Sequence, residues 1–131
     1  MRLLLDSHVW LWMGMDRARM GAAALSSIED RGNDLFLSIA SIWELGIKDE
    51  IGKLRLPQEF QGYVRTRLVK SEAAVLNLSP EHVFELKGIG GHHRDPFDRI
   101  LVAQARVESM TLVTADERLL KYSVQTLDAR T

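Results

Sequence analysis

The chain of 131 residues contains no cysteine. Its absence excludes disulfide frameworks, thiol nucleophiles, iron–sulfur clusters and zinc sites built on thiolates. It also gives no sign of an oxidising compartment, so we expect a cytoplasmic protein. A metal bound by this chain must therefore be held by oxygen or by histidine nitrogen, and a nucleophile must be something other than sulfur.

An excess of charge of one sign is also missing, because 17 Lys and Arg residues stand against 18 Asp and Glu residues, for a formal net charge of −1. This balance argues against bulk electrostatic binding of DNA or anionic membranes, although a local patch stays possible.

Long apolar runs are missing as well. The stretch from Val9 to Met15 is far shorter than the ~20 residues of a membrane span, and no targeting signal is recognisable. We therefore expect no membrane partner.

Length and composition indicate one globular domain. A chain of this size suits a single hydrophobic core, and 46% hydrophobic with 27% charged residues is ordinary for a globular protein. No internal repeat, low-complexity tract or Pro/Gly/Ser linker divides the sequence. Residues 1–131 are therefore interpreted as a single domain.

Short apolar runs alternate with segments of helical periodicity along the chain. The apolar runs predict strands at 3–5, 35–37, 74–78, 111–114 and 124–127. Helical spacing and cap signals predict helices at 20–30, 38–50, from 57 to about 70, 80–87, 95–108 and 116–121, and glycines predict a loop at 88–94. The alternation predicts an α/β fold, with a central, mostly parallel sheet flanked by helices on both faces.

Four carboxylates are expected at one edge of this sheet. Asp6 follows the first strand, Asp116 follows the fourth, and Asp98 lies in the first turn of the helix before the fourth strand. Glu44 lies between apolar neighbours in the helix after the second strand, where burial of a carboxylate is costly without a positive partner. Ligands bind outside the carboxyl ends of parallel strands, and clustered oxygens suit Mg²⁺ or Mn²⁺. The pattern therefore predicts a metal site able to support displacement at a phosphodiester.

Each acid also has a purely structural interpretation. Asp6 and Asp116 stand where they can N-cap the helices that follow them. Asp95 and Asp98 fit the cap and third positions of one helix, where both would complement its dipole. Glu44 is four residues before a lysine, an ion pair worth ~0.2–0.5 kcal/mol on a solvated face. Only the shared edge of the sheet favours the metal site over these separate explanations.

Four stretches resemble the motif blocks of PIN-domain ribonucleases, and most closely those of the VapC-type toxins of bacterial toxin–antitoxin pairs. They are LLDSHVWLW at 4–12, SIASIWEL at 38–45, HRDPFDRILVAQA at 93–105 and LVTAD at 112–116. The resemblance covers nearly the whole chain in the family's order. It implies a PIN-like fold and an Mg²⁺- or Mn²⁺-dependent endoribonuclease that cleaves single strands or loops of RNA.

The resemblance also implies roles for individual residues. Asp6, Glu44 and Asp98 match the family's metal-binding acids, and Asp116 matches a fourth acid whose role varies. Asp95 is typical of a subgroup with the sequence Asp-Pro-Phe-Asp, and we assign it first to capping and second to the site. These four matched acids are therefore the expected catalytic residues.

Three further residues are candidates for contact with the substrate. Arg94 and Arg99 lie close to the acids in the sequence, where they can contact a phosphate or form ion pairs with the acids. Ser7 stands where the family commonly has threonine, so the hydroxyl is kept. We expect contact with RNA from these side chains, and both interpretations of the two arginines stay open.

Partners and alternative functions complete the expectations. The resemblance implies a cognate antitoxin and a homodimer, for which the apolar stretch that includes Trp10, Trp12 and Met13 is a candidate face; core packing is the other interpretation. A phosphohydrolase with an aspartyl nucleophile at Asp6 would need a second aspartate where the chain has His8. A noncatalytic α/β binding module, whose acids serve only as caps, is the third possibility.

Overall fold

The computed structural model describes residues 1–90 and 95–131. Its sheet has the strand order β3-β2-β1-β4-β5, and every neighbouring pair is parallel. The strands are β1 (Arg2–Leu5), β2 (Asp34–Ser38), β3 (Ala74–Leu76), β4 (Thr111–Thr114) and β5 (Thr126–Asp128). The predicted α/β class is confirmed, and the sheet is parallel throughout rather than mostly so.

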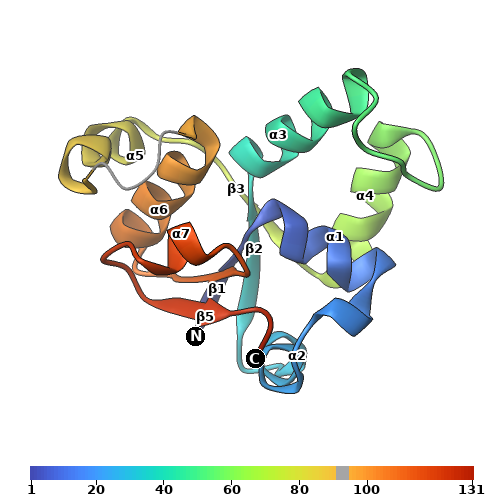
Figure 1. The fold of residues 1–131 in the computed structure, drawn as a ribbon, viewed down its shortest axis with the longest axis horizontal. Helices are drawn as coiled ribbons and strands as arrows, with labels where there is room; N and C mark the ends of the chain where they lie inside the picture. The colour runs from blue at the N-terminus through green and yellow to red at the C-terminus, as the bar shows by residue number, and fades with distance from the viewer. Residues whose placement is uncertain (91–94) are drawn as a thin grey trace.

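Helices cover both faces of the sheet (Figure 1). In this view α1, α2 and α4 lie on one side, α5, α6 and α7 on the other, and α3 lies beyond the carboxyl end of β2. The helices are α1 (Ser7–Met15), α2 (Ala22–Glu29), α3 (Ile39–Glu50), α4 (Phe60–Ser71), α5 (Pro80–Glu85), α6 (Pro96–Glu108) and α7 (Glu117–Leu120).

The central strand β1 shows why the chain needs two helical layers. Side chains alternate along a strand, so Leu3 and Leu5 pack into one core with α1 and α4, and Leu4 packs into a second core with α6. All three leucines are fully buried. A strand covered on both faces is apolar at every position, which explains the continuous run that marks β1 in the sequence.

Several element boundaries differ from the prediction, among them the starts of α4 and β5. The helix expected from Pro57 begins at Phe60, because the carboxylate of Glu59 caps it by accepting hydrogen bonds from the backbone N–H groups of Gln61 and Gly62 at 3.1 and 2.7 Å. The last strand is Thr126–Asp128, two residues later than its expected start. The predicted loop at 88–94 falls partly on residues 91–94, which lie outside the described residues.

The apolar N-terminal stretch belongs mainly to the core. Trp10 is only 1% exposed and meets Tyr63 edge to face, with ring centroids 6.4 Å apart. Met13 and Met20 are also buried, while Met15 is exposed. Core packing, one of the two interpretations of this stretch, therefore accounts for Trp10 and Met13, whereas Trp12 is only partly buried. Within the described residues, every helix is too short or too polar to cross a membrane.

Candidate metal centre

Asp6 lies at the carboxyl end of β1, where its backbone N–H extends the ladder by donating to the carbonyl of Val113 at 3.0 Å. It occupies the N-cap position of α1, yet its side chain makes no capping hydrogen bond. The buried carboxylate instead accepts from the hydroxyl of Thr114, whose Oγ1 is 2.8 Å from Oδ2. The capping interpretation is therefore wrong for Asp6, because its oxygens face the end of the sheet.

Ser7 joins Asp6 to Glu44. Its hydroxyl donates to Oε1 of Glu44 at 2.8 Å and lies 3.3 Å from Oδ1 of Asp6. A serine hydroxyl has one hydrogen, so the shorter contact is the stronger bond and the longer one is secondary. Ser7 is 0% exposed, which leaves this side chain positioned between two buried carboxylates rather than toward a substrate.

Glu44 lies on α3, is buried, and has the lysine partner that the sequence indicates. Nζ of Lys48 is 3.8 Å from Oε2, while Oε1 accepts from Ser7. A simple ion pair on a solvated face would leave the carboxylate in water, whereas this one is buried at the end of the sheet. The ion pair and the site are therefore compatible, and the lysine supplies the positive partner that burial requires.

Asp95 and Asp98 come from the first turn of α6. Asp95 is the N-cap, and its Oδ1 accepts from the backbone N–H groups of Phe97 and Asp98 at 2.9 and 3.3 Å. Asp98 is buried, and it forms a cluster with Asp95 and Glu44 in which one carboxylate oxygen of each lies within 4.8 Å of the others. Asp95 thus caps the helix, as predicted, and also stands in the acidic cluster.

Asp116 has the capping role that the sequence also allowed. Its Oδ1 accepts from the backbone N–H of Arg118 at 2.9 Å, which caps α7. The guanidinium of Arg118 also holds both oxygens, with Nε 3.3 Å from Oδ1 and Nη2 3.2 Å from Oδ2. Asp116 nevertheless stands beside the acids, because it lines the same hollow as Asp6, of about 480 Å³.

Arg118 is a cation at this edge that the sequence interpretation missed. The hydrogen bond to Asp116, then the charge of Asp116, raise the pKa of Arg118 above its ordinary value, with smaller contributions from Asp98 and Asp95. Of the two arginines named from the sequence, Arg94 lies outside the described residues. Arg99 donates to the backbone carbonyls of Leu86 and Gly90 at 3.1 and 2.7 Å.

The donor set fits a divalent cation. Three carboxylates whose oxygens lie within 4.8 Å of one another need only a small contraction to share one ion, since two oxygens bound at ~2.1 Å stand up to about 4.2 Å apart. Like charges this close destabilise one another unless a cation neutralises them. Hard oxygen ligands favour Mg²⁺, Mn²⁺ or Ca²⁺ over softer metals. The cluster can therefore hold a metal ion.

The sequence profile of the PIN domain matches residues 3–125, which is nearly the whole chain. The chain belongs to the PIN-domain family. This PIN domain is also similar to "Ribonuclease VapC22" of Mycobacterium tuberculosis, with 28% identity over 127 residues that cover 92% of this chain and 91% of that protein. The family resemblance found in the motif blocks is thereby confirmed.

Solved structures share the fold of this PIN domain. VapBC2 from Rickettsia felis, bound to a DNA fragment from its promoter, aligns with a TM-score of 0.74 and 14% identity over 98% of both chains. FitAB bound to the IR36 DNA fragment aligns with a TM-score of 0.72 and 16% identity, over 98% of this chain and 96% of that one. VapBC-1 from nontypeable Haemophilus influenzae aligns with a TM-score of 0.67 and 18% identity, over 100% of both chains. At these identities the likeness establishes the fold alone.

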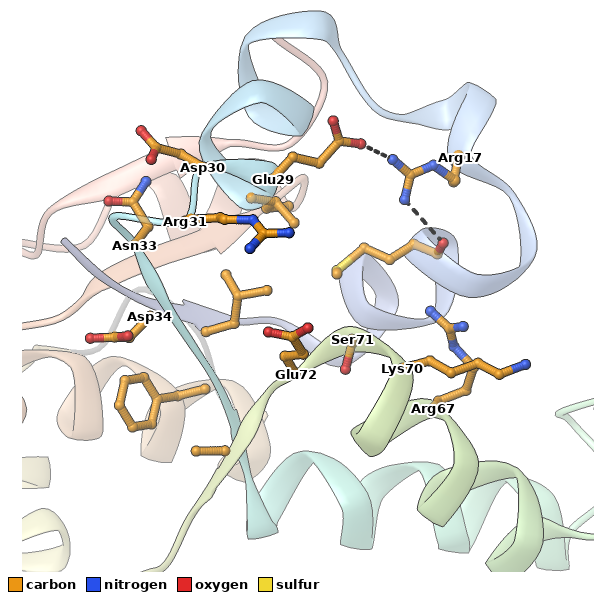
Figure 2. Close-up of a pocket in the computed structure, with 15 residues that line it drawn as sticks. Arg17, Glu29, Asp30, Arg31, Asn33, Asp34, Arg67, Lys70, Ser71 and Glu72 are labelled. Carbon is orange, nitrogen blue, oxygen red and sulfur yellow. Dashed lines mark hydrogen bonds and ion pairs between the residues drawn. The ribbon is translucent and has the colours of Figure 1, made fainter.

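A larger hollow, of about 580 Å³, lies at the opposite edge of the sheet of this PIN domain (Figure 2). It is bordered by the amino ends of β2 and β3 and by the last turns of α2 and α4, and Arg17 pairs with Glu29 on its wall. Its charged side chains balance: Arg17, Arg31, Arg67 and Lys70 against Glu29, Asp30, Asp34 and Glu72. The acidic edge is therefore the candidate site although its hollow is smaller, because the carboxylate cluster lies there.

Proposed function

We propose that this PIN-domain protein is a metal-dependent endoribonuclease and the toxin of a toxin–antitoxin pair. The observation that carries the proposal is the cluster of Glu44, Asp95 and Asp98, with Asp6 tied to Glu44 through Ser7. Membership of the PIN family and the similarity to a protein named a VapC ribonuclease support the activity. The acidic cluster thus supports the proposal from the structure, and the PIN family and the similar ribonuclease support it from related proteins.

Asp6, Glu44 and Asp98 are the proposed principal metal ligands, and Mg²⁺ or Mn²⁺ the proposed ion. Asp95 belongs to the cluster and is proposed as a further ligand. Asp116 contributes negative charge at the rim, where Arg118 contacts both of its oxygens. A bound divalent ion would neutralise the cluster toward a phosphate and make a water more acidic. The chemistry proposed is hydrolysis of an RNA phosphodiester.

The other side chains position the ligands. The Thr114 hydroxyl donates to Oδ2 of Asp6, which turns the opposite oxygen of that carboxylate toward Ser7. The Ser7 hydroxyl then fixes Oε1 of Glu44. Outer partners of this kind orient metal ligands, and their loss typically costs 10–100-fold in metal affinity or activity. Ser7 is therefore proposed as a positioning residue instead of a substrate contact.

The proposed partners are an RNA strand and a cognate antitoxin, and a homodimer is the proposed assembly. Two of the structural neighbours are described as VapBC assemblies and one as FitAB. Unpaired RNA is the favoured substrate, because a flexible backbone can bend into the acidic edge. The noncatalytic alternative is disfavoured because Asp6 makes no capping bond.

The test is cleavage of a structured RNA by the purified protein in Mg²⁺, in Mn²⁺ and in EDTA, with Asp98→Asn and Glu44→Gln beside it. We expect cuts in unpaired regions in either metal, none in EDTA, and a loss of at least about 10-fold in both variants. Ser41→Ala is the matched control, because Ser41 is a buried side chain of α3 for which the described residues offer no hydrogen-bond partner. Cleavage that persists in EDTA would refute the proposal.

A further inference from the structure

Trp43 is exposed to an extent that is unusual for a tryptophan. It is 62% exposed on α3, whereas Trp10 is 1% exposed in the core. A large aromatic side chain left in water loses the burial free energy it would contribute in the interior, and tryptophan is enriched at binding surfaces. The position therefore calls for an explanation beyond packing.

The indole of Trp43 is held in place by a second aromatic ring. Its centroid is 5.0 Å from that of Phe97, and the two planes meet at 80°, which is an edge-to-face contact between α3 and α6. Such contacts contribute beyond the buried area and fix the plane of the rings. Trp43 is therefore an oriented ring that presents most of its surface to solvent.

The ring pair borders the acidic cluster. Trp43 directly precedes Glu44 on α3, and Phe97 directly precedes Asp98 on α6, so each helix supplies one ring and one clustered acid. Successive helical residues are turned by about 100°, which places the rings beside the acids and not on the far side of the helices. A nucleotide whose phosphate lies at the cluster would thus have an aromatic surface next to it.

We propose that Trp43 is a stacking platform for an RNA base next to the scissile phosphate, an inference that rests on the proposed nuclease function. Every base has a π-face, so an aromatic platform accepts unpaired bases with little regard to sequence. A base inside a duplex is already stacked and paired, and its face is inaccessible. Trp43 thereby adds a preference for unpaired bases to the preference for a flexible backbone at the acidic edge.

The test compares RNA with and without bases. In the Asp6→Asn background, which keeps bound RNA uncut, fluorescence anisotropy measures the binding of labelled 12-nucleotide oligo(A) and of an abasic ribose-phosphate strand of equal length. One stacked base contributes roughly 1–3 kcal/mol, so Trp43→Ala should weaken oligo(A) binding about 5- to 150-fold and leave the abasic strand unchanged. Trp43→Phe should keep most of the affinity.

Phe84→Ala is the matched control, because Phe84 is a 72% exposed aromatic residue on α5, outside the ring pair. Its oligo(A) binding should equal that of the parent, and circular dichroism should show all variants folded. Equal affinity of Trp43→Ala and its parent for oligo(A) would overturn the platform, as would an effect confined to self-association in sedimentation.

Failure of the platform and failure of the nuclease assignment give different results. If the wild type cuts RNA in Mg²⁺ and Trp43→Ala cuts it with unchanged kcat/KM, the platform is wrong and the nuclease stands. If the wild type neither cuts nor binds RNA, both are wrong. A rise in KM for Trp43→Ala with kcat retained supports the platform, because stacking then contributes to binding and not to the chemical step.

Discussion

Replacing Ser7 by alanine removes the hydroxyl that separates two buried carboxylates. In the wild type this hydroxyl donates to Glu44 at 2.8 Å and stands 3.3 Å from Asp6. After the change Asp6 still accepts from Thr114 and Glu44 still faces Lys48, but nothing donates between the two acids. The variant is therefore expected to lose a charge-assisted hydrogen bond and to gain repulsion between two carboxylates.

The size of the loss follows from the burial of this contact. A hydrogen bond to a charged group contributes about 1.5–3 kcal/mol, and the single lost oxygen leaves little cavity. We expect about 2 kcal/mol less free energy of unfolding for Ser7→Ala. At about 2.1 cal/mol/K per residue, a chain of 131 residues should then melt about 7 °C lower.

Thermal unfolding followed by circular dichroism, with and without Mg²⁺, measures this effect. Ser41→Ala removes another buried hydroxyl, for which the described residues show no partner, and should leave Tm nearly unchanged. Adding Mg²⁺ should reduce the difference in Tm between Ser7→Ala and the wild type, because a bound ion neutralises the two acids. If the Tm of Ser7→Ala in metal-free buffer equals that of Ser41→Ala, the Ser7 hydroxyl does not hold the two acids together, which would refute this prediction.

Three other substitutions probe separate contacts. Thr114→Val keeps the shape but removes the 2.8 Å donor to Asp6, so it should lower Tm and weaken stabilisation by Mg²⁺, and an unchanged Mg²⁺ titration would contradict this. Glu59→Ala removes the cap of α4 and should cost about 1 kcal/mol in urea unfolding, whereas no loss would mean that the cap is dispensable. Hydrogen bonds from the Arg130 side chain and backbone lower the pKa of Asp128. They therefore stabilise the fold fully above the ordinary carboxyl pKa of about 4, and this contribution is lost as the pH falls through the lowered pKa of the folded state. Arg130→Ala should therefore be destabilised at pH 7, and its difference from the wild type should shrink as the pH falls below about 4. A difference in stability that stays constant over this range would count against the pair.

The sequence predicts the edge at which the acids lie, but it does not predict their detailed contacts. β1 and β4 are neighbours in a parallel sheet, so Asp6 and Asp116 follow strands that end at the same edge. Helices at that edge add Glu44 and Asp98. Local pattern and the rules of parallel sheets are enough for this placement, because each acid is fixed by the element that it follows or begins.

Side-chain partners required the structure, because they depend on contacts between residues far apart in the sequence. Ser7 joins two acids 38 positions apart, and only the packing of α1 against α3 brings its hydroxyl to Glu44. Arg99 lies one residue from Asp98, yet its guanidinium turns to backbone carbonyls. Arg118 was detectable only as a cation two residues after Asp116, a spacing that is common on any surface.

The start of α4 shows the same limit in a local feature. Pro57 is a strong signal for a first helical position, but Glu59 offers a side-chain cap two residues later. The Glu59 carboxylate accepts hydrogen bonds from two backbone N–H groups of the first turn. A proline at the first helical position has no side-chain acceptor, so the N–H groups of that turn would depend on water. Competing start signals of this kind are resolved by hydrogen bonds that the sequence does not display.

The most direct test of the metal-dependent nuclease is the rate of RNA cleavage by the wild type, Asp6→Asn and Asp34→Asn in Mg²⁺. Asp34 is an exposed aspartate at the amino end of β2, opposite the acidic edge, and controls for the loss of one negative charge. We expect Asp34→Asn to cleave at the wild-type rate, and folded Asp6→Asn to cleave at a rate at least about 100-fold lower. Equal cleavage by Asp6→Asn and the wild type would contradict this expectation.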